Sequence, residues 1–244
     1  MISGDKNYNG VIDDLVNGSW ISQTDNKQYG IPIKNIEIRK TLDGRECDLI
    51  ESLHSNQKLL VVSDPFTHKA MGSRIFNNLK VNINVDEYIW EQPSSSIEGV
   101  QFLRTKLKDY DGMIAVGSGT VSDSIKYATF LEDKVYSVFA TTPMNAYTTG
   151  TASISFDGIK KSLVAHYAQG VFFDLEVLSN CPKRLTAAAF ADVICRTTAQ
   201  VDWLMSHKLL NTDYKTTPYE LLALYEMEMI NNASDIAAGK IDSL

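Results

Sequence analysis

The 244-residue sequence has few cysteines, no cluster of basic residues and no long apolar run. Three cysteines, an odd number, do not form a disulfide framework and suit a reducing compartment. A net charge of -7 without a lysine or arginine cluster argues against a nucleic-acid partner. The first residues lack the apolar segment of a secretory leader, and no stretch approaches membrane-spanning length. We therefore expect a cytoplasmic protein with no membrane span.

Two common phosphate-binding patterns are also absent. The P-loop pattern Gly-x-x-x-x-Gly-Lys-Ser/Thr does not occur in the chain. The dinucleotide pattern Gly-x-Gly-x-x-Gly fails at its third glycine, because Ser122 stands there. A nucleotide site in this chain would therefore have to use a different glycine turn.

Such a turn follows the apolar run 113–116, which is expected to be a buried strand. The turn consists of Gly117, Ser118, Gly119 and Thr120. Thr120 is expected to cap a helix that carries Asp123 and Lys126 on one face, near whatever the turn holds. A strand, a glycine turn and a helix start direct backbone N–H groups at a phosphate. From these residues alone, the segment is either a nucleotide pyrophosphate site or an ordinary tight turn.

Strand-like and helical segments alternate between residues 31 and 181. With 44% hydrophobic and 22% charged residues, the chain can bury a sizeable core. Strands are expected at 34–39, 58–63, 81–88, 113–116, 135–139 and 171–173. Helices are expected at 67–78, 96–108 and 121–131. The alternation predicts an α/β, Rossmann-like domain with a mostly parallel sheet, which binds ligands beyond the carboxyl ends of its strands.

The two ends of the chain have a different character. Residues 1–30 are polar and predict an N-terminal arm with a short helix around 11–16. Residues 182–244 lack strand-like segments and predict the start of a helical domain, with one long helix at 184–208 and a second one capped by Thr217. The second helix is apolar over more than half its circumference, and the remaining chain is too short to cover it. We expect a homo-oligomer or association with a missing C-terminal segment.

Several motifs in sequence order resemble a known family. The pattern Gly-Ser-Gly-Thr-x-x-Asp-x-x-Lys at 117–126 is similar to a motif of the iron-containing alcohol dehydrogenase and dehydroquinate synthase superfamily. Further similar segments are 141–148, 157–162, 173–178 and 189–193. Within the superfamily, the sequence most resembles the glycerol-1-phosphate dehydrogenase group, which includes the bacterial AraM-like enzymes. The resemblance extends from about residue 31 to about residue 210.

The resemblance implies an NAD-linked dehydrogenase, with NADP possible, that acts on a polyol phosphate of the glycerol 1-phosphate or dihydroxyacetone phosphate type. It implies that the glycine turn, with Asp123 and Lys126, holds the pyrophosphate. Thr141 and Thr142 would face the nucleotide, although from chemistry alone their hydroxyls could simply satisfy the loop backbone. Asp64, which follows a strand, would bind the adenosine ribose; the residues alone equally allow a helix cap in Ser-Asp-Pro-Phe.

For the substrate, the resemblance singles out Asn145, because many relatives have an aspartate there that holds a substrate hydroxyl. Asparagine keeps an acceptor but loses the charge, so the exact substrate stays open. Lys160, Lys161 and His166 form a small basic group that could meet a substrate phosphate or belong to a solvated loop.

Asp192 matches the family's aspartate ligand to a divalent metal such as Zn, Ni or Fe. From the residues alone, a carboxylate among apolar neighbours needs a partner, and Arg196 lies one turn on. A catalytic metal needs about three protein ligands. His207 is too far along an unbroken helix, roughly 22 Å from Asp192, and His166 is the one spatially possible helper.

The metal site is therefore expected to be incomplete, and no catalytic residue is assigned. Two alternative functions follow: a non-catalytic NAD-binding protein, or a cyclase similar to dehydroquinate synthase. Against the cyclase, Asp192 stands where that family has a metal-binding glutamate.

Asp64 gives the first testable prediction. A carboxylate beside the ribose would repel a 2′-phosphate, so the protein should prefer NAD over NADP. Asp64→Ser should bring the ratio of the dissociation constants of NADP and NAD, measured by calorimetry, closer to one. Equal affinities for NAD and NADP in the unaltered protein would remove Asp64 from the site.

Overall fold

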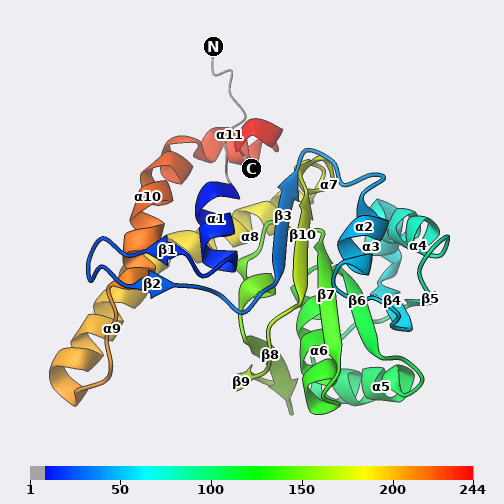
Figure 1. Cartoon of the computed structure of the whole chain (residues 1–244). Helices are drawn as coiled ribbons and strands as arrows, with labels where there is room; N and C mark the ends of the chain where they lie inside the picture. Colours follow the sequence, from blue (N-terminus) through cyan, green and yellow to red (C-terminus); the bar gives the residue numbers. More distant parts are fainter. Residues whose placement is uncertain (1–8, 244) are drawn as a thin grey trace.

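The computed structural model describes residues 9–243, so the first eight residues of the predicted arm lie outside it. Its centre is a six-stranded sheet (Figure 1). The strands are β3 (Asn35–Arg39), β4 (Leu59–Ser63), β5 (Val85–Ile89), β6 (Gly112–Gly117), β7 (Val135–Ala140) and β10 (Gly170–Asp174). Their spatial order is β3-β10-β7-β6-β4-β5, and every neighbouring pair is parallel. The predicted Rossmann-like parallel sheet is confirmed.

Helices cover both faces of this sheet. One face packs against α1 (Asn9–Val16), α5 (Ile97–Leu107) and α6 (Gly119–Leu131). The other packs against α2 (Glu46–Glu51) and a continuous helical segment made of α3 (Pro65–Thr67), the π-helix η1 (His68–Gly72) and α4 (Ser73–Leu79). Successive residues of β4 point into opposite clusters: Leu60 and Val62 into the first, Leu59 and Val61 into the second. Burial on both faces explains why the strand sequence is continuously apolar.

The chain reverses direction across the sheet between β4 and β6. From β4 it proceeds to β5 at the edge, and then returns past β4 to form β6, β7 and β10. The strand ends are level, since Ser63 lies beside Val116, and Gly117 lies beside Ala140. Parallel sheets bind ligands at such a topological switch point, beyond the carboxyl ends of the strands.

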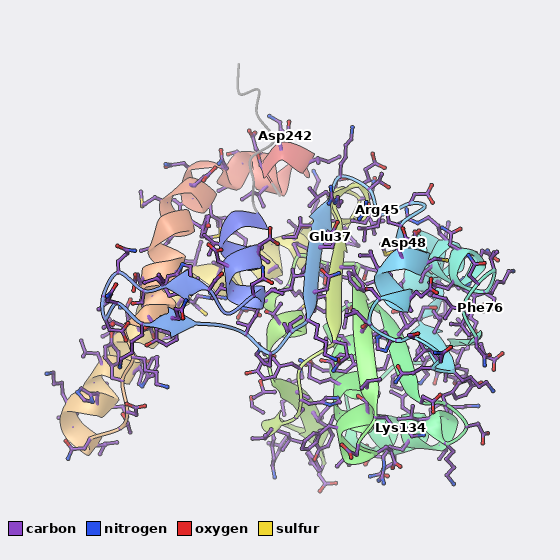
Figure 2. The ribbon with its side chains drawn as sticks, viewed as in Figure 1. Glu37, Arg45, Asp48, Phe76, Lys134 and Asp242 are labelled. Carbon is purple, nitrogen blue, oxygen red and sulfur yellow. The ribbon has the colours of Figure 1, made fainter. Side chains whose placement is uncertain are left out.

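Ion pairs join the loops at this carboxyl end. Arg74 on α4 contacts two fully buried carboxylates, those of Asp174 at 2.6 Å and Glu46 at 3.1 Å. Arg45, which follows β3, lies 3.6 Å from the carboxylate of Glu37. Figure 2 shows Arg45 far from Lys134, which directly precedes β7 and therefore marks the amino end of that strand. The loops after β3, β4 and β10 are thus held in one arrangement.

Two antiparallel hairpins were not expected from the sequence. One comprises β1 (Trp20–Ile21) and β2 (Gln28–Tyr29); the other comprises β8 (Thr151–Phe156) and β9 (Ile159–Val164). The second turns at Asp157 and Gly158, whose φ angles are 50° and 80°. Asp-Gly between alternating apolar and polar residues is a strong indication of a type I′ hairpin, and could have predicted this one.

Some predicted boundaries were wrong. The strand predicted at 81–88 is β5, which begins only at Val85 because residues 81–84 form a turn. Helix α6 begins at Gly119, so Thr120 lies in its first turn and is not its cap. The long helix predicted at 184–208 is interrupted at Cys195. Thr216, not Thr217, precedes the last long helix, and its side chain makes no capping bond.

The C-terminal part consists of α7 (Leu175–Ser179), α8 (Lys183–Ile194), α9 (Arg196–Leu210), α10 (Thr217–Asn231), α11 (Ala233–Ala237) and the 3-10 helix η3 (Ile241–Ser243). Figure 1 shows α9 and α10 projecting from the side of the α/β layers. These two helices expose the apolar residues Val201, Leu204, Met205, Leu209, Leu210, Tyr225, Met227 and Ile230. Between residues 9 and 243, no helix is both long and apolar enough to cross a membrane.

Figure 1 shows the N-terminal hairpin next to α10, and the carboxylate of Glu220 bonds the two together. Glu220 Oε2 accepts hydrogen bonds from the hydroxyls of Ser22 at 2.7 Å and Thr24 at 2.8 Å. Its Oε1 accepts the backbone N–H of Gln23. Glu220, in the first turn of α10, therefore binds a turn from the N-terminal part of the chain.

Candidate nucleotide-binding site

The glycine turn presents free donors at the carboxyl end of β6. Ser118, which precedes α6, makes no side-chain capping bond, and its carbonyl accepts the N–H of Ser122 at 3.0 Å. The N–H groups of Gly119, Thr120 and Val121 belong to the first turn and have no carbonyl partner within the helix. Residues 118–120 are half-buried, whereas Val121 is fully buried, so the N–H groups of Gly119 and Thr120 are the candidate donors to a ligand. Together with the positive end of a 13-residue helix, they can bind an anion.

Lack of space, rather than left-handed backbone, is what requires glycine in this turn. A Cβ on Gly117 would lie 2.7 Å from Cβ of Val121, closer than packing allows. A Cβ on Gly119 would lie 3.3 Å from the terminal methyl of Met144, which belongs to the loop after β7. The turn is therefore enclosed by its own helix and by that neighbouring loop.

The predicted Thr141 and Thr142 lie beside this turn but differ in their bonding. Tyr147 Oη donates to the carbonyl of Gly117 at 3.0 Å, so Thr142 Oγ1 is the donor to Tyr147 Oη at 2.7 Å. These two hydrogen bonds fix the carbonyl of Gly117 at the end of β6. Thr141 Oγ1 is buried and has no hydrogen-bond partner among the described residues. A buried hydroxyl without a partner next to accessible helix N–H groups fits a ligand oxygen.

Tyr147 had been given no role from the sequence. Tyr147 belongs to the family-like segment 141–148. A large aromatic residue in an otherwise polar loop was the sequence signal that could have indicated its role in positioning this loop. Burial raises the pKa of Tyr147, which keeps the hydroxyl a proton donor.

Asp64 directly follows β4 and is the N-cap of α3. Its Oδ1 accepts the N–H groups of Phe66 at 2.8 Å and Thr67 at 2.9 Å, while Thr67 Oγ1 accepts the N–H of Asp64 at 3.0 Å. The alternative drawn from Ser-Asp-Pro-Phe is therefore present in the structure. An ionised carboxylate has about four acceptor positions, so the cap leaves capacity for a ligand hydroxyl. The predicted ribose contact stays a prediction.

Asp123 and Lys126 form a buried node instead of projecting freely toward the turn. Lys126 is fully buried; its Nζ lies 3.4 Å from Asp123 Oδ1 and donates to the carbonyls of Ala146 at 2.7 Å and Thr151 at 2.9 Å. Asp123 Oδ2 accepts the N–H of Ser153 at 3.1 Å. Burial raises the pKa of Asp123 and lowers the pKa of Lys126, and their mutual attraction opposes both shifts. The pair ties α6 to the loop after β7 and to β8.

Asn145 and Asp192 are brought together. Asn145 Nδ2 donates to Asp192 Oδ2 at 2.7 Å, which joins the loop after β7 to α8. Asp192 is exposed, so the expectation of a carboxylate in apolar surroundings is wrong, and its observed partner is Asn145 rather than Arg196.

The metal expected from the family was tested against these side chains. Among residues 9–243, no group of three or more histidine, cysteine, aspartate or glutamate side chains could hold a metal ion. Asp192 alone supplies one oxygen ligand, whereas a catalytic site needs about three. His207 lies on α9, with its Nδ1 2.7 Å from the carbonyl of Thr212, and it belongs to no such group of ligands among the described residues. The described residues do not fit a metal centre, and we derive no step through one.

His166 is separated from the glycine turn. Its Nε2 lies 2.9 Å from Thr129 Oγ1, and its ring stacks on Tyr136 at 5.2 Å. Thr129 is ten residues along α6 from Gly119, or about 15 Å. Burial lowers the pKa of His166, which favours the neutral ring. The predicted basic group is therefore not assembled: His166 packs into the fold, whereas Lys160 and Lys161 are exposed on β9.

Comparison with known proteins agrees with this architecture. Residues 37–182 match the family described as iron-containing alcohol dehydrogenase. Glycerol-1-phosphate dehydrogenase (NAD(P)+) of Geobacillus thermodenitrificans is 30% identical over 192 residues, which cover 75% of this chain and 47% of that protein. The Bacillus subtilis protein of the same name is 28% identical over 220 residues, covering 86% and 55%. The chain thus spans about half the length of the curated relatives it matches.

Solved structures show the same fold. The iron-containing alcohol dehydrogenase of Thermotoga maritima superposes with a TM-score of 0.69 at 16% identity, covering 87% of this chain and 63% of that one. Glycerol dehydrogenase of Schizosaccharomyces pombe gives a TM-score of 0.60 at 19% identity, covering 67% and 42%. At these identities the likeness concerns the fold alone.

The buried node generates a stability prediction. Lys126→Met leaves Asp123 and two carbonyls buried without their cation, and loss of one partner of a buried pair costs roughly 3–5 kcal/mol. Urea denaturation should show this loss in the free energy of unfolding. Lys160→Met, at an exposed position, should change the stability by less than about 0.5 kcal/mol. Equal stability of the two variants would contradict the role given to Lys126.

Proposed function

Because this chain belongs to the iron-containing alcohol dehydrogenase family, we propose that it binds NAD at the glycine turn as the nucleotide-binding part of a glycerol-1-phosphate dehydrogenase-type enzyme. One observation carries the proposal: accessible helix N–H groups and the unpartnered Thr141 hydroxyl lie at the topological switch point of a parallel sheet. That combination suits a pyrophosphate.

Each residue has a role in this proposal. The amides of Gly119 and Thr120 hold pyrophosphate oxygens, and the Thr141 hydroxyl donates a hydrogen bond to the same ligand. Asp64 accepts a hydrogen bond from the adenosine ribose, which favours NAD over NADP. Thr142 acts through Tyr147 by fixing the end of β6. Asp123 and Lys126 support the turn from beneath. When bound, the nicotinamide supplies the hydride acceptor or donor.

For the whole protein we propose a polyol phosphate substrate of the glycerol 1-phosphate or dihydroxyacetone phosphate type. The relatives carry glycerol-1-phosphate dehydrogenase names, which supports this class. Asn145 is the candidate for a substrate hydroxyl, and the exposed Lys160 and Lys161 are candidates for the phosphate. Asp192 is kept as the candidate for the family's metal ligand, with Zn, Ni or Fe as the candidate ions.

The organisation of the protein is also a proposal. We place the nucleotide-binding domain at 31–181 and the start of a helical domain at 182–244, in a cytoplasmic protein. The exposed apolar residues of α9 and α10 support association with a second copy or with a further helical segment. A pocket of about 320 Å³ lies between the loop after β7, α8 and α10, and its lining combines apolar residues such as Phe190 with polar ones such as Asn232.

The first experiment measures NAD binding to the metal-free protein by calorimetry. The proposal expects binding, because helix N–H groups need no metal. Gly119→Val should weaken it at least about tenfold, or 1.4 kcal/mol, by pushing the Met144 loop away from the turn. Gly119→Ala, whose single methyl would meet only the mobile end of Met144, serves as the milder control. A folded protein that binds no NAD, or a Gly119→Val variant with unaltered affinity, would defeat the proposal.

The second experiment tests catalysis by the 244-residue chain. One carboxylate competes weakly for a metal, so little bound Zn²⁺ or Ni²⁺ and little NADH-dependent reduction of dihydroxyacetone phosphate are expected. The lone Asp192 and its amide partner Asn145 also favour a second candidate function, that of an NAD-binding protein without catalysis. Stoichiometric metal and rapid turnover would reject this second function, and would require His166 or a partner chain to complete the site.

A further inference from the structure

Phe66 is exposed at the start of α3, which follows β4, the strand beside the one that ends in the glycine turn. With 86% of its surface accessible, it has the highest exposed fraction of the large apolar residues that the structure describes as exposed. It lies two residues after Asp64, directly beyond the carboxyl end of β4. Eight of the other exposed large apolar residues lie together on α9 and α10, and Phe66 is not part of that surface.

The backbone that carries Phe66 is fixed. Its N–H donates to Asp64 Oδ1 at 2.8 Å, and Pro65 precedes it at the start of α3. Cα–Cβ bonds in a helix tilt toward the N-terminus, so the side chain of a first-turn residue leans back toward the strand end. A rigid aromatic residue with only two side-chain torsions loses little entropy when a ligand covers it.

We propose that Phe66 is the platform on which the adenine ring of the dinucleotide stacks. This inference rests on the proposed function. It assigns a residue to the adenine, the part of the ligand for which no contact has been proposed above. Pyrophosphate at the end of β6 and ribose at Asp64 place the adenosine over the end of β4, and adjacent strands lie only about 4.8 Å apart. The adenine, next along the molecule, then extends over the start of α3, where Phe66 stands.

The flat aromatic face also predicts which ligands benefit. Stacking on an aromatic side chain depends on the π-face of the base and not on its hydrogen-bonding groups. Phe66 should therefore strengthen binding of ADP-ribose and NAD equally, and should have no effect on nicotinamide mononucleotide. Asp64 and Phe66 together would bind the adenosine half of the dinucleotide, while the glycine turn binds its phosphates.

The test compares dissociation constants of NAD, ADP-ribose and nicotinamide mononucleotide, measured by calorimetry. Phe66→Ala should weaken NAD and ADP-ribose about tenfold, or 1.4 kcal/mol, and leave nicotinamide mononucleotide unchanged. Phe66→Tyr should retain wild-type affinity. Val81→Ala is the matched control, because Val81 is 73% exposed in the turn before β5 and should not affect any of the ligands.

A second readout uses Phe66→Trp. Tryptophan fluorescence in this variant, minus that of the unaltered protein, should be quenched by ADP-ribose and not by nicotinamide mononucleotide. If the unaltered protein binds NAD while Phe66→Ala binds it equally well and the new tryptophan is not quenched, the role of Phe66 is rejected and the proposed function stands. If the unaltered protein binds neither NAD nor ADP-ribose, the proposed function fails, and the role of Phe66 fails with it.

Discussion

The buried ammonium group of Lys126 is the interaction on which the functional edge depends. It belongs to α6, whose first turn supplies the candidate phosphate donors, and it bonds the carbonyls of Ala146 and Thr151. One cation therefore fixes the helix start relative to the loop that carries Asn145 and to β8. A charge can be buried at this depth only because a carboxylate and several carbonyls replace its water. Lys126 thus holds the glycine turn in place without using the turn's own N–H groups, which stay free for a ligand.

Much of the fold could be predicted because a buried parallel strand is recognisable by its continuous apolar sequence, as in residues 59–63. The β8–β9 hairpin was missed although its Asp-Gly turn was visible, because β9 carries the consecutive exposed polar residues Lys160, Lys161 and Ser162 and so does not alternate. The interruption at Cys195 depends on tertiary packing that local propensity does not contain. In the candidate site, the positions of Asp64 and Thr141 at strand ends followed from the pattern. The burial of Lys126 did not, because its acceptors come from segments about 20 residues away.

The site consists of two parts that differ in completeness. The nucleotide part draws on β4, β6 and β7, all held within the parallel sheet, so its geometry needs nothing from α9 or α10. The other part, where Asn145 meets Asp192, is a single hydrogen bond between a loop and an exposed helix face. Rigid positioning thus belongs to the part that would hold the cofactor. The part proposed to face the substrate includes Asp192 of α8 and therefore depends on how that helix is held.

The Glu220 contact has a consequence for how the molecule is built during synthesis. Its bonds to Ser22 and Thr24 connect residues 198 and 196 positions apart in the chain. Contacts this distant are entropically expensive to close and form late. During translation, the β1–β2 turn emerges from the ribosome long before its acceptor exists. The parallel sheet, which does not include this hairpin, can therefore assemble while the hairpin is still unattached to α10.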